Sequence, residues 1–152
     1  MKNYQKILKK VELIINTKQS IETKLKFISS HLESRIEKYH WVGFYISDNK
    51  KKQLTLGPYS GKETPHKVIP FGRGVCGRVA NDKKSLLIND VKKEKNYISC
   101  NMDVKSEIVY PIIKNGIVIG EIDIDSNYIN AFNHEDEFLL MKICDQLVNH
   151  MI

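Results

Sequence analysis

The feature that most constrains the fold is an Asn115-Gly116 pair between two runs rich in β-branched residues. The tightest hairpin turns need positive φ at both central residues, a conformation that asparagine and glycine tolerate. We therefore expect strands over 106–113 and 117–125, joined by this turn into an antiparallel hairpin.

Helical and strand-like patterns divide the rest of the chain. Apolar residues recur at helical spacing over 1–40, where a break near 16–18 precedes a second helix capped by Ser20, and again over 133–152. Between these ends we expect strands at 41–46, 53–57, 67–70 and 85–88, a short helix at 75–81, and polar loops at 58–65 and 90–103. The pattern predicts one domain over 1–152 with an α+β fold: an antiparallel sheet of about six strands with pocket loops over 41–131, flanked by the N-terminal and C-terminal helices.

Composition narrows the environment and the partners. The net charge of the 152 residues is +6, but the lysines are scattered, so we expect a solvated surface and no nucleic-acid partner. No apolar run reaches the roughly 18 residues of a membrane span, so we expect no membrane partner. Three cysteines without a Cys-x-x-Cys pair argue against a disulfide framework and a zinc site. We expect a cytoplasmic protein with free thiols, no metal and no bound cofactor.

Two of the cysteines lie in segments that indicate reactivity. Cys76 lies in FGRGVCG, where Arg73 and an expected helix start favour the thiolate; the alternative is a buried cysteine packed as a small hydrophobic residue. Cys100 lies in the long polar loop among lysines, a setting that favours a reactive thiol; the alternative is an incidental exposed thiol. Cys144, in the apolar stripe of the last helix, is expected to pack in the core.

Acidic residues gather on the second strand of the hairpin. Alternation places Asp123 and Asp125 on one face, which Glu121 shares. Close carboxyl groups cannot all ionise cheaply, so one is expected to hold a proton near neutral pH. Glu107 adds a further acid if the hairpin pairs as expected. The alternative is a solvated strand face.

An aromatic pair completes the candidate set. Trp41 and Tyr45 are four residues apart, so on a strand they share a face that can line a pocket or, alternatively, belong to the sheet core. With two thiols and the acids, this set suits reduction of a soft electrophile. A thiolate attacks, an acid protonates the leaving oxygen, and a second thiol closes a disulfide, as in a sulfoxide or peroxide reductase.

Six segments give the chain a family resemblance: WVGFYI, LTLGPYSGK, IPFGRGVCG, NYISCNMDVKSEIVYPI, NGIVIGEIDIDS and FNHEDEFL. In these the chain resembles the free methionine-(R)-sulfoxide reductases, which are single GAF domains. The resemblance implies that Cys100 attacks the sulfoxide sulfur and becomes a sulfenic acid, and that Cys76 is a second pocket cysteine. It implies a free methionine sulfoxide substrate, thioredoxin or another thiol as external reductant, and an assembly that is often a homodimer.

The resemblance also assigns the remaining site residues. Glu107, Asp123 and Asp125 match acids that hold the substrate amine and assist protonation of the sulfoxide oxygen. Trp41 and Tyr45 match aromatics that enclose the methyl group.

The chain departs from this family at one position. The family usually carries another cysteine ten positions before the Gly-Val-Cys-Gly cysteine, and this thiol commonly resolves the sulfenic acid, whereas this chain has His66 there. Cys76 or an external thiol would then resolve Cys100. Two functions stay open: a reductase, favoured by the acids and Cys100, and a GAF module that binds a small molecule without chemistry.

Overall fold

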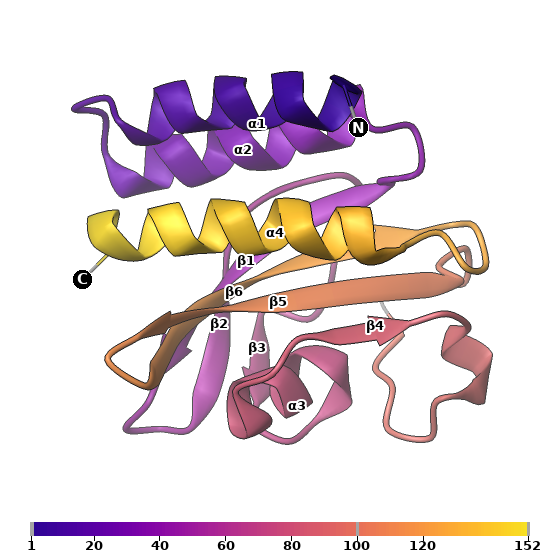
Figure 1. Ribbon diagram of the computed structural model, residues 1–152. Coiled ribbons are helices and arrows are strands. Elements are labelled where there is room, and N and C mark those ends of the chain that lie inside the picture. The colour runs from indigo at the N-terminus through magenta and orange to yellow at the C-terminus, as the bar shows by residue number, and fades with distance from the viewer. Residues whose placement is uncertain (1, 100, 152) are drawn as a thin grey trace.

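Six strands and four α-helices make up the computed structural model, which describes residues 2–99 and 101–151 (Figure 1). In chain order the elements are α1 (Lys2–Ile15), α2 (Ile21–Arg35), β1 (Trp41–Asp48), β2 (Gln53–Ser60), β3 (Val68–Pro70), α3 (Gly74–Asp82), β4 (Leu86–Ile88), the 3₁₀ turn η1 (Val91–Lys93), β5 (Ser106–Lys114), β6 (Ile117–Ser126), α4 (His134–Leu147) and the 3₁₀ turn η2 (Val148–His150). The strands form one antiparallel sheet in the order β3-β2-β1-β6-β5-β4. The predicted α+β fold is confirmed.

The central hairpin forms as its turn residues predict. Asn115 and Gly116 both have positive φ, 52° and 78°, and Lys114 pairs with Ile117 on either side of them. The register continues to the open end of the hairpin, where Glu107 of β5 lies opposite Asp125 of β6. The turn therefore sets which acids face one another across the two strands.

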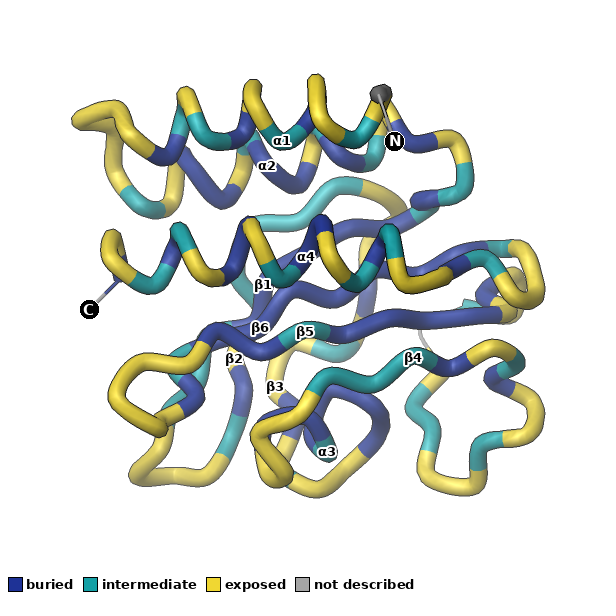
Figure 2. The backbone as a smooth tube through the Cα atoms, viewed as in Figure 1, coloured by how far each residue is buried: buried dark blue, intermediate teal, exposed yellow. Residues whose placement is uncertain are grey.

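The sheet separates two apolar layers (Figure 1). Helices α1, α2 and α4 cover one face, where Phe44, Ile122 and Ile124 are buried. Helix α3 lies on the other face, where Tyr45 and Val109 are buried in a second cluster. Figure 2 shows the central strands buried over most of their length, while the helices expose their outer sides. Residues adjacent in sequence on a central strand therefore contribute to different layers.

Capping residues fix where the long helices begin. Ser20 accepts a hydrogen bond from the Thr23 N–H at 3.2 Å, which confirms it as the N-cap of α2. Asn133 caps α4 in a capping box with Asp136. The C-terminal helix was predicted too long: α4 ends at Leu147, and one 3₁₀ turn follows it.

The prediction of a polar loop over 58–65 is wrong at its start. Strand β2 continues to Ser60, which pairs with Val42 of β1. Pro58 is tolerated there because β3 pairs only with residues 53–55 of β2, so beyond them one side of β2 is a free edge that needs no N–H donor. Within residues 2–99 and 101–151, no helix combines the length and apolar character that crossing a bilayer requires.

Candidate active site

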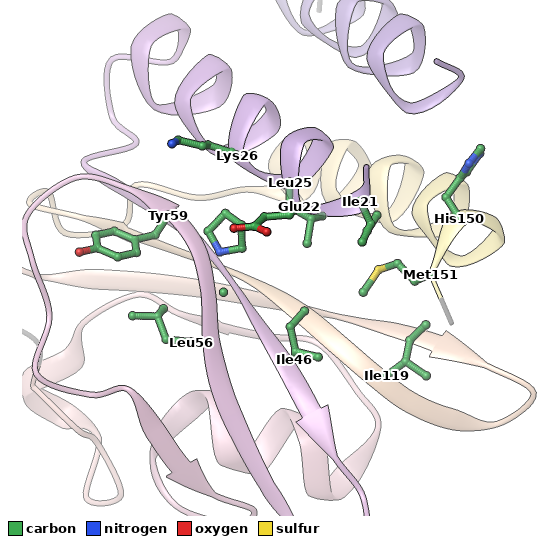
Figure 3. A pocket seen from close by; sticks show the side chains of 12 residues that line it. Ile21, Glu22, Leu25, Lys26, Ile46, Leu56, Tyr59, Ile119, His150 and Met151 are labelled. Atoms are coloured by element: carbon green, nitrogen blue, oxygen red, sulfur yellow. The ribbon is translucent and has the colours of Figure 1, made fainter. Parts of the chain in front are cut away.

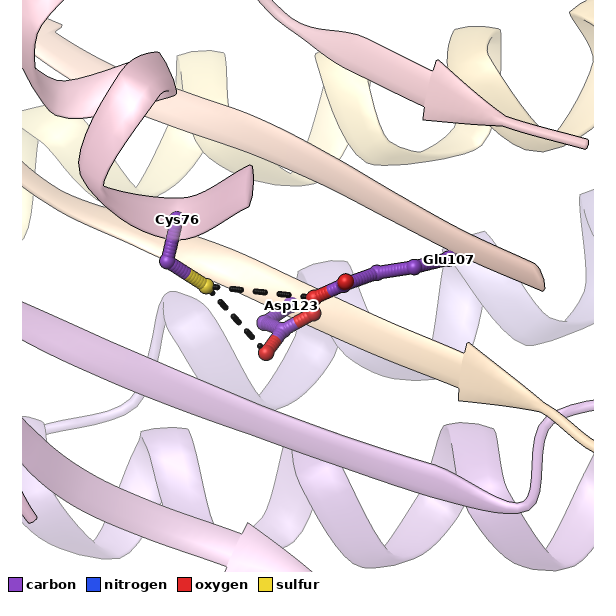
Figure 4. Close-up of side chains that lie close together, drawn as sticks. All are labelled: Cys76, Glu107 and Asp123. Atoms are coloured by element: carbon purple, nitrogen blue, oxygen red, sulfur yellow. Dashed lines mark hydrogen bonds between the residues drawn. The ribbon is translucent and has the colours of Figure 1, made fainter. Parts of the chain in front are cut away.

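Two glycines place Cys76 against the sheet. Helix α3 begins at Gly74, whose φ of +66° lies in the left-handed region that favours glycine. A Cβ at Gly77 would lie 2.6 Å from the Pro70 carbonyl oxygen, so only glycine lets α3 pack this closely on the end of β3. Cys76, the third residue of α3, is 5% exposed and points toward β6 (Figure 4).

Carboxyl groups from two strands meet the Cys76 thiol. The thiol donates a hydrogen bond to Asp123 Oδ2 at 3.2 Å and a longer one to Glu107 Oε2 at 4.0 Å (Figure 4). Asp125 and Glu121 are buried on the same face of β6, which excludes a solvated strand face. The structure therefore brings Cys76 together with Glu107 and Asp123, two of the acids that the sequence singles out.

Burial sets the protonation of the thiol. It raises the pKa of the Cys76 thiol well above its ordinary value, and the charges of Asp123, Glu121 and Glu107 raise it further. The expectation that Arg73 and the helix start favour the thiolate at Cys76 is therefore wrong. Arg73 is exposed at the N-cap of α3, so its charge remains in solvent while the buried acids face the thiol.

The acids are shifted in the same direction. Burial raises the pKa of Glu121, Asp123 and Asp125, and the charge of Asp123 also raises the pKa of Glu121 and Asp125. Burial thus favours the protonated form of these carboxyl groups, in the direction of the sequence-based expectation of a protonated acid. Burial and the neighbouring acids likewise favour the neutral form of the Cys76 thiol.

Glu121 was not among the predicted site residues. It is fully buried, and neither of its oxygens has a hydrogen-bond partner among the described residues. Strand alternation placed it on the aspartate face, so its direction was readable from the sequence. Its burial depends on how α3 packs across the sheet, which no local pattern reports.

The space beside Cys76 is small. Its volume is about 10 Å³, which is room for about one water molecule. The residues that line it come from β1, β3, β5, β6, α3 and three loops: Tyr45, His66, Ile69, Arg73, Gly74, Val75, Cys76, Ile98, Glu107 and Asp123. An amino acid is several times larger than this space, so a substrate can enter only if the lining moves.

The two predicted aromatics occupy different positions. Tyr45 lines the cavity, and its hydroxyl donates to the His66 carbonyl oxygen at 2.9 Å. Trp41 is buried at the first position of β1, where it pairs with Asp125 of β6. Its ring stacks on that of Tyr59, with ring centroids 5.4 Å apart. Trp41 does not line the cavity in this closed arrangement.

A loop covers the cavity and is tied to α3. Asn96 Oδ1 accepts from the Gly74 N–H at 2.8 Å, and Asn96 Nδ2–H donates to the Gly72 carbonyl at 2.9 Å. Ile98 then packs on Gly74, where a Cβ would lie 2.9 Å from its side chain. Sequence reasoning missed Asn96, because a side chain that bridges two backbone groups of a distant segment has no local signature.

His66 contacts Ser99, the residue that precedes Cys100 in the sequence. His66 Nε2 lies 2.9 Å from the Ser99 carbonyl oxygen, within hydrogen-bond distance. Cys100, the predicted nucleophile, follows Ser99 in the chain but lies outside the described residues.

The third cysteine, Cys144, is buried on the helix side of the sheet, and its thiol contacts the Tyr110 carbonyl oxygen at 3.9 Å. It packs in the core as expected.

A larger hollow lies elsewhere and has a different character (Figure 3). It is an open groove of about 840 Å³ between α2, the sheet and the C-terminal end of the chain. Its lining is Ile21, Glu22, Leu25, Lys26, Ile46, Leu56, Gly57, Pro58, Tyr59, Ile119, His150 and Met151. This set contains no cysteine and one carboxyl group, so the thiol and acid chemistry belongs to the small cavity.

Comparison with known proteins agrees with this fold. The GAF domain family matches residues 34–151. GAF domain-containing protein A of Dictyostelium discoideum is 34% identical over 146 residues, which are 96% of this chain and 90% of that protein. Free methionine-R-sulfoxide reductase of Escherichia coli is 37% identical over 119 residues, 78% of this chain and 70% of that protein.

Solved structures agree as well. The structure of free methionine-R-sulfoxide reductase from Neisseria meningitidis in complex with its substrate superposes with a TM-score of 0.92 at 29% identity, covering 97% of this chain and 87% of that one. The six-stranded sheet with its flanking helices and the family match over residues 34–151 together show that this chain is a GAF-domain protein. Within that class, the chain belongs to the free methionine-(R)-sulfoxide reductase family and is an oxidoreductase.

Proposed function

We propose that this chain reduces free L-methionine (R)-S-oxide to L-methionine by thiol chemistry. The observation that carries the proposal is the buried cluster in which the Cys76 thiol meets Asp123 and Glu107 of the central hairpin. Proton-holding carboxyl groups in an enclosed site suit a reaction that must protonate a sulfoxide oxygen as its bond to sulfur breaks. The resemblance assigns the nucleophile to Cys100.

The first step uses a cysteine sulfur and the protons of the cluster. The Cys100 thiolate attacks the sulfoxide sulfur and forms an S–S bond, while a carboxyl group donates one proton to the oxygen. The resulting hydroxyl then passes from the methionine sulfur to the Cys100 sulfur as the S–S bond and the original S–O bond break. Methionine leaves, and Cys100 becomes a sulfenic acid. Burial, which raises the pKa of Asp123 and Asp125, keeps such protons available at neutral pH.

The second step uses Cys76. Its sulfur attacks the sulfenic sulfur, the hydroxyl leaves as water, and a Cys76–Cys100 disulfide forms. Asp123 Oδ2, which accepts the thiol hydrogen bond at 3.2 Å, is positioned to take the proton when Cys76 becomes the nucleophile. Thioredoxin or another dithiol then reduces the disulfide. One sulfoxide and one dithiol thus give one thioether, one disulfide and water.

Recognition of the substrate uses the remaining residues. We assign the substrate amine to Glu107, Asp123 and Asp125, since buried carboxyl groups become favourable partners of a cation once it enters. Tyr45 lines the cavity, whereas Trp41, four residues earlier on the same strand, lies outside its lining. In this assignment both aromatics contact the substrate methyl group only after the cavity opens. We also propose a cytoplasmic location, which suits free thiols, and a homodimeric assembly by analogy with similar proteins.

Turnover of single sulfoxide epimers tests the reductase. With a thioredoxin system, the chain should consume the R epimer of free methionine sulfoxide and leave the S epimer. Cys100→Ser should abolish turnover. Cys144→Ser, which changes a thiol on the helix side of the sheet, is the matched control and should retain it. Turnover that persists in Cys100→Ser would contradict the assigned nucleophile.

Mass spectrometry after one turnover tests the role of Cys76. The wild type should lose two hydrogens as a Cys76–Cys100 disulfide forms, whereas Cys76→Ser should stop at a sulfenic acid that a dimedone probe traps. A trapped sulfenic acid in the wild type would remove Cys76 from the resolving role.

A non-catalytic binding module is the second candidate. It is favoured by His66, which stands where the family usually has its resolving cysteine. Calorimetric binding of methionine sulfoxide without consumption of either epimer, at any concentration of reductant, would select this alternative.

A further inference from the structure

We propose that Cys76, Glu107 and Asp123 form a binding site for a thiophilic divalent cation of the zinc type, which occupies the cavity in place of an organic ligand. The three residues come from α3, β5 and β6 (Figure 4). Cys76 and Asp123 are 47 positions apart, which explains why cysteine spacing gave no sign of a metal. This inference stands apart from the reductase proposal, because it concerns binding in the absence of any sulfoxide.

The donor atoms lie at separations that a tetrahedral ion accepts. Cys76 Sγ is 3.2 Å from Asp123 Oδ2 and 4.0 Å from Glu107 Oε2, and the three donor atoms all lie within 4.8 Å of one another. Zinc bonds of about 2.3 Å to sulfur and about 2.0–2.2 Å to oxygen, at tetrahedral angles, put sulfur and oxygen about 3.5 Å apart. Both distances lie within about half an ångström of that value, so small side-chain movements close the site.

Polar atoms that lack partners point to a missing cation. Asp123 Oδ1 and Asp125 Oδ1 are buried without a hydrogen-bond partner, and each residue is 2% exposed. Asp123 Oδ1 belongs to the same carboxyl group whose other oxygen contacts the thiol. Among residues 2–99 and 101–151, no ion pair joins Asp123 or Asp125 to a lysine or arginine. A dication bound in the cluster would give these two buried oxygens a partner.

The size of the cavity separates an ion from an organic ligand. About 10 Å³ beside Cys76 is room for one ion or one water molecule, whereas an amino acid needs the lining to move. Sulfur with carboxylate oxygen is a donor set that zinc accepts, and water can complete the coordination. On binding, the Cys76 S–H bond breaks, a Zn–S bond forms, and the proton leaves to solvent.

Calorimetry of the metal-free, reduced chain tests the site. Zinc should bind with one equivalent per chain. Cys76→Ser and Asp123→Asn should each weaken binding by more than the roughly 10–100-fold that the loss of an outer-shell partner costs. Cys144→Ser, which changes a thiol on the helix side of the sheet, should bind as the wild type does. No binding by the wild type, or binding that Cys76→Ser and Asp123→Asn leave unchanged, overturns the proposal.

Two further measurements keep the test decisive if a variant fails to fold. Cobalt added to the wild type should give a thiolate-to-metal charge-transfer band, which Asp123→Asn should weaken. Zinc should also slow alkylation of Cys76 by iodoacetamide, followed by peptide mass spectrometry. An alkylation rate that zinc does not change contradicts the site. These experiments contain no sulfoxide, so a chain that binds zinc but reduces nothing would refute only the reductase proposal, and the reverse outcome only this one.

Discussion

Glu121 carries a buried carboxyl group whose oxygens have no hydrogen-bond partner among the described residues. Such a group costs stability, because its hydration is lost and nothing replaces it. Glu121→Met keeps the length of the side chain and removes the polar atoms. We expect it to raise the free energy of unfolding by about 1–2 kcal/mol, measured by urea denaturation near neutral pH.

Glu121→Gln is the matched control for that substitution. It keeps a polar group of the same shape, so its gain in the free energy of unfolding should be smaller than that of Glu121→Met. A loss of stability in Glu121→Met would instead show that the carboxyl group has a partner that stabilises the fold.

His66 is the residue at which the chain departs from its family, and its contact suggests a positioning role. Its ring nitrogen lies 2.9 Å from the Ser99 carbonyl oxygen, beside the proposed nucleophile in the chain. His66→Ala removes this contact, and the loss of one hydrogen bond of about 0.5–1.5 kcal/mol corresponds to a roughly 2–10-fold lower kcat. His66→Gln retains a donor and should recover most of the rate, measured with the R epimer. If Gln and Ala lower kcat equally, the hydrogen bond does not position the loop.

Single residues also show where sequence reasoning ends. The directions of Asp123, Asp125 and Tyr45 were predictable, because alternation along a strand is local. The state of the Cys76 thiol was not, because its pKa depends on how deeply α3 buries it and on acids from distant strands. The same limit hid Asn96, whose partners belong to the turn before α3.

At the scale of elements, Asp136 joins the N-terminal helices to α4. The hydroxyl groups of Tyr4 and Tyr39 donate to its Oδ1 at 2.6 Å, and Lys38 Nζ donates to its Oδ2 at 2.7 Å. Burial alone raises the pKa of Asp136, but these hydrogen bonds outweigh it and lower the pKa below its ordinary value. Asp136→Asn should reduce the free energy of unfolding by about 3 kcal/mol, because one partner of a buried charge network is lost.

The pH dependence distinguishes this network from simple packing. A carboxyl group with a lowered pKa in the folded state stabilises the fold above its unfolded pKa of about 3.9, and this contribution is lost as the pH falls. Urea unfolding at a series of acidic pH values should show that loss in the wild type and a weaker one in Asp136→Asn. Asp103→Asn is the control, since its ion pair with Lys62 is exposed and should contribute little.

Helix and strand boundaries were predictable from the sequence where a nearby turn or capping residue determines them. The Asn115-Gly116 turn, the Ser20 cap and the Asn133 cap each specify a boundary through their own backbone geometry. The end of β2 was missed, because Pro58 ends a strand in the interior of a sheet but not along a free edge. Which edge is free depends on strand order, and strand order is a property of the whole sheet.

At the scale of the whole molecule, the thiol and acids of the candidate active site lie on one face of the sheet, and the three long helices lie on the other. The layer beneath α1, α2 and α4 is apolar, while the layer beneath α3 combines apolar side chains with a thiol and several acids (Figure 1). The acid-bearing layer is covered by a short helix and a loop rather than by a long helix. Local opening on that side therefore disrupts little of the apolar core, and low-stability regions of this kind are where ligands enter.

Entry to the cavity should require release of the loop that carries Asn96. Asn96→Ala removes both of its side-chain hydrogen bonds, which tie the loop to Gly72 and Gly74. Two bonds of about 0.5–1.5 kcal/mol each would favour the open state enough to raise alkylation of Cys76 about 10-fold under native conditions. Asn49→Ala, which removes a 3.0 Å bond to the Val118 carbonyl at another part of the sheet, should leave that rate unchanged. Equal acceleration in both variants would mean that Cys76 becomes accessible through general destabilisation, whereas acceleration in Asn96→Ala alone identifies this loop as the route by which substrate and metal reach the acids.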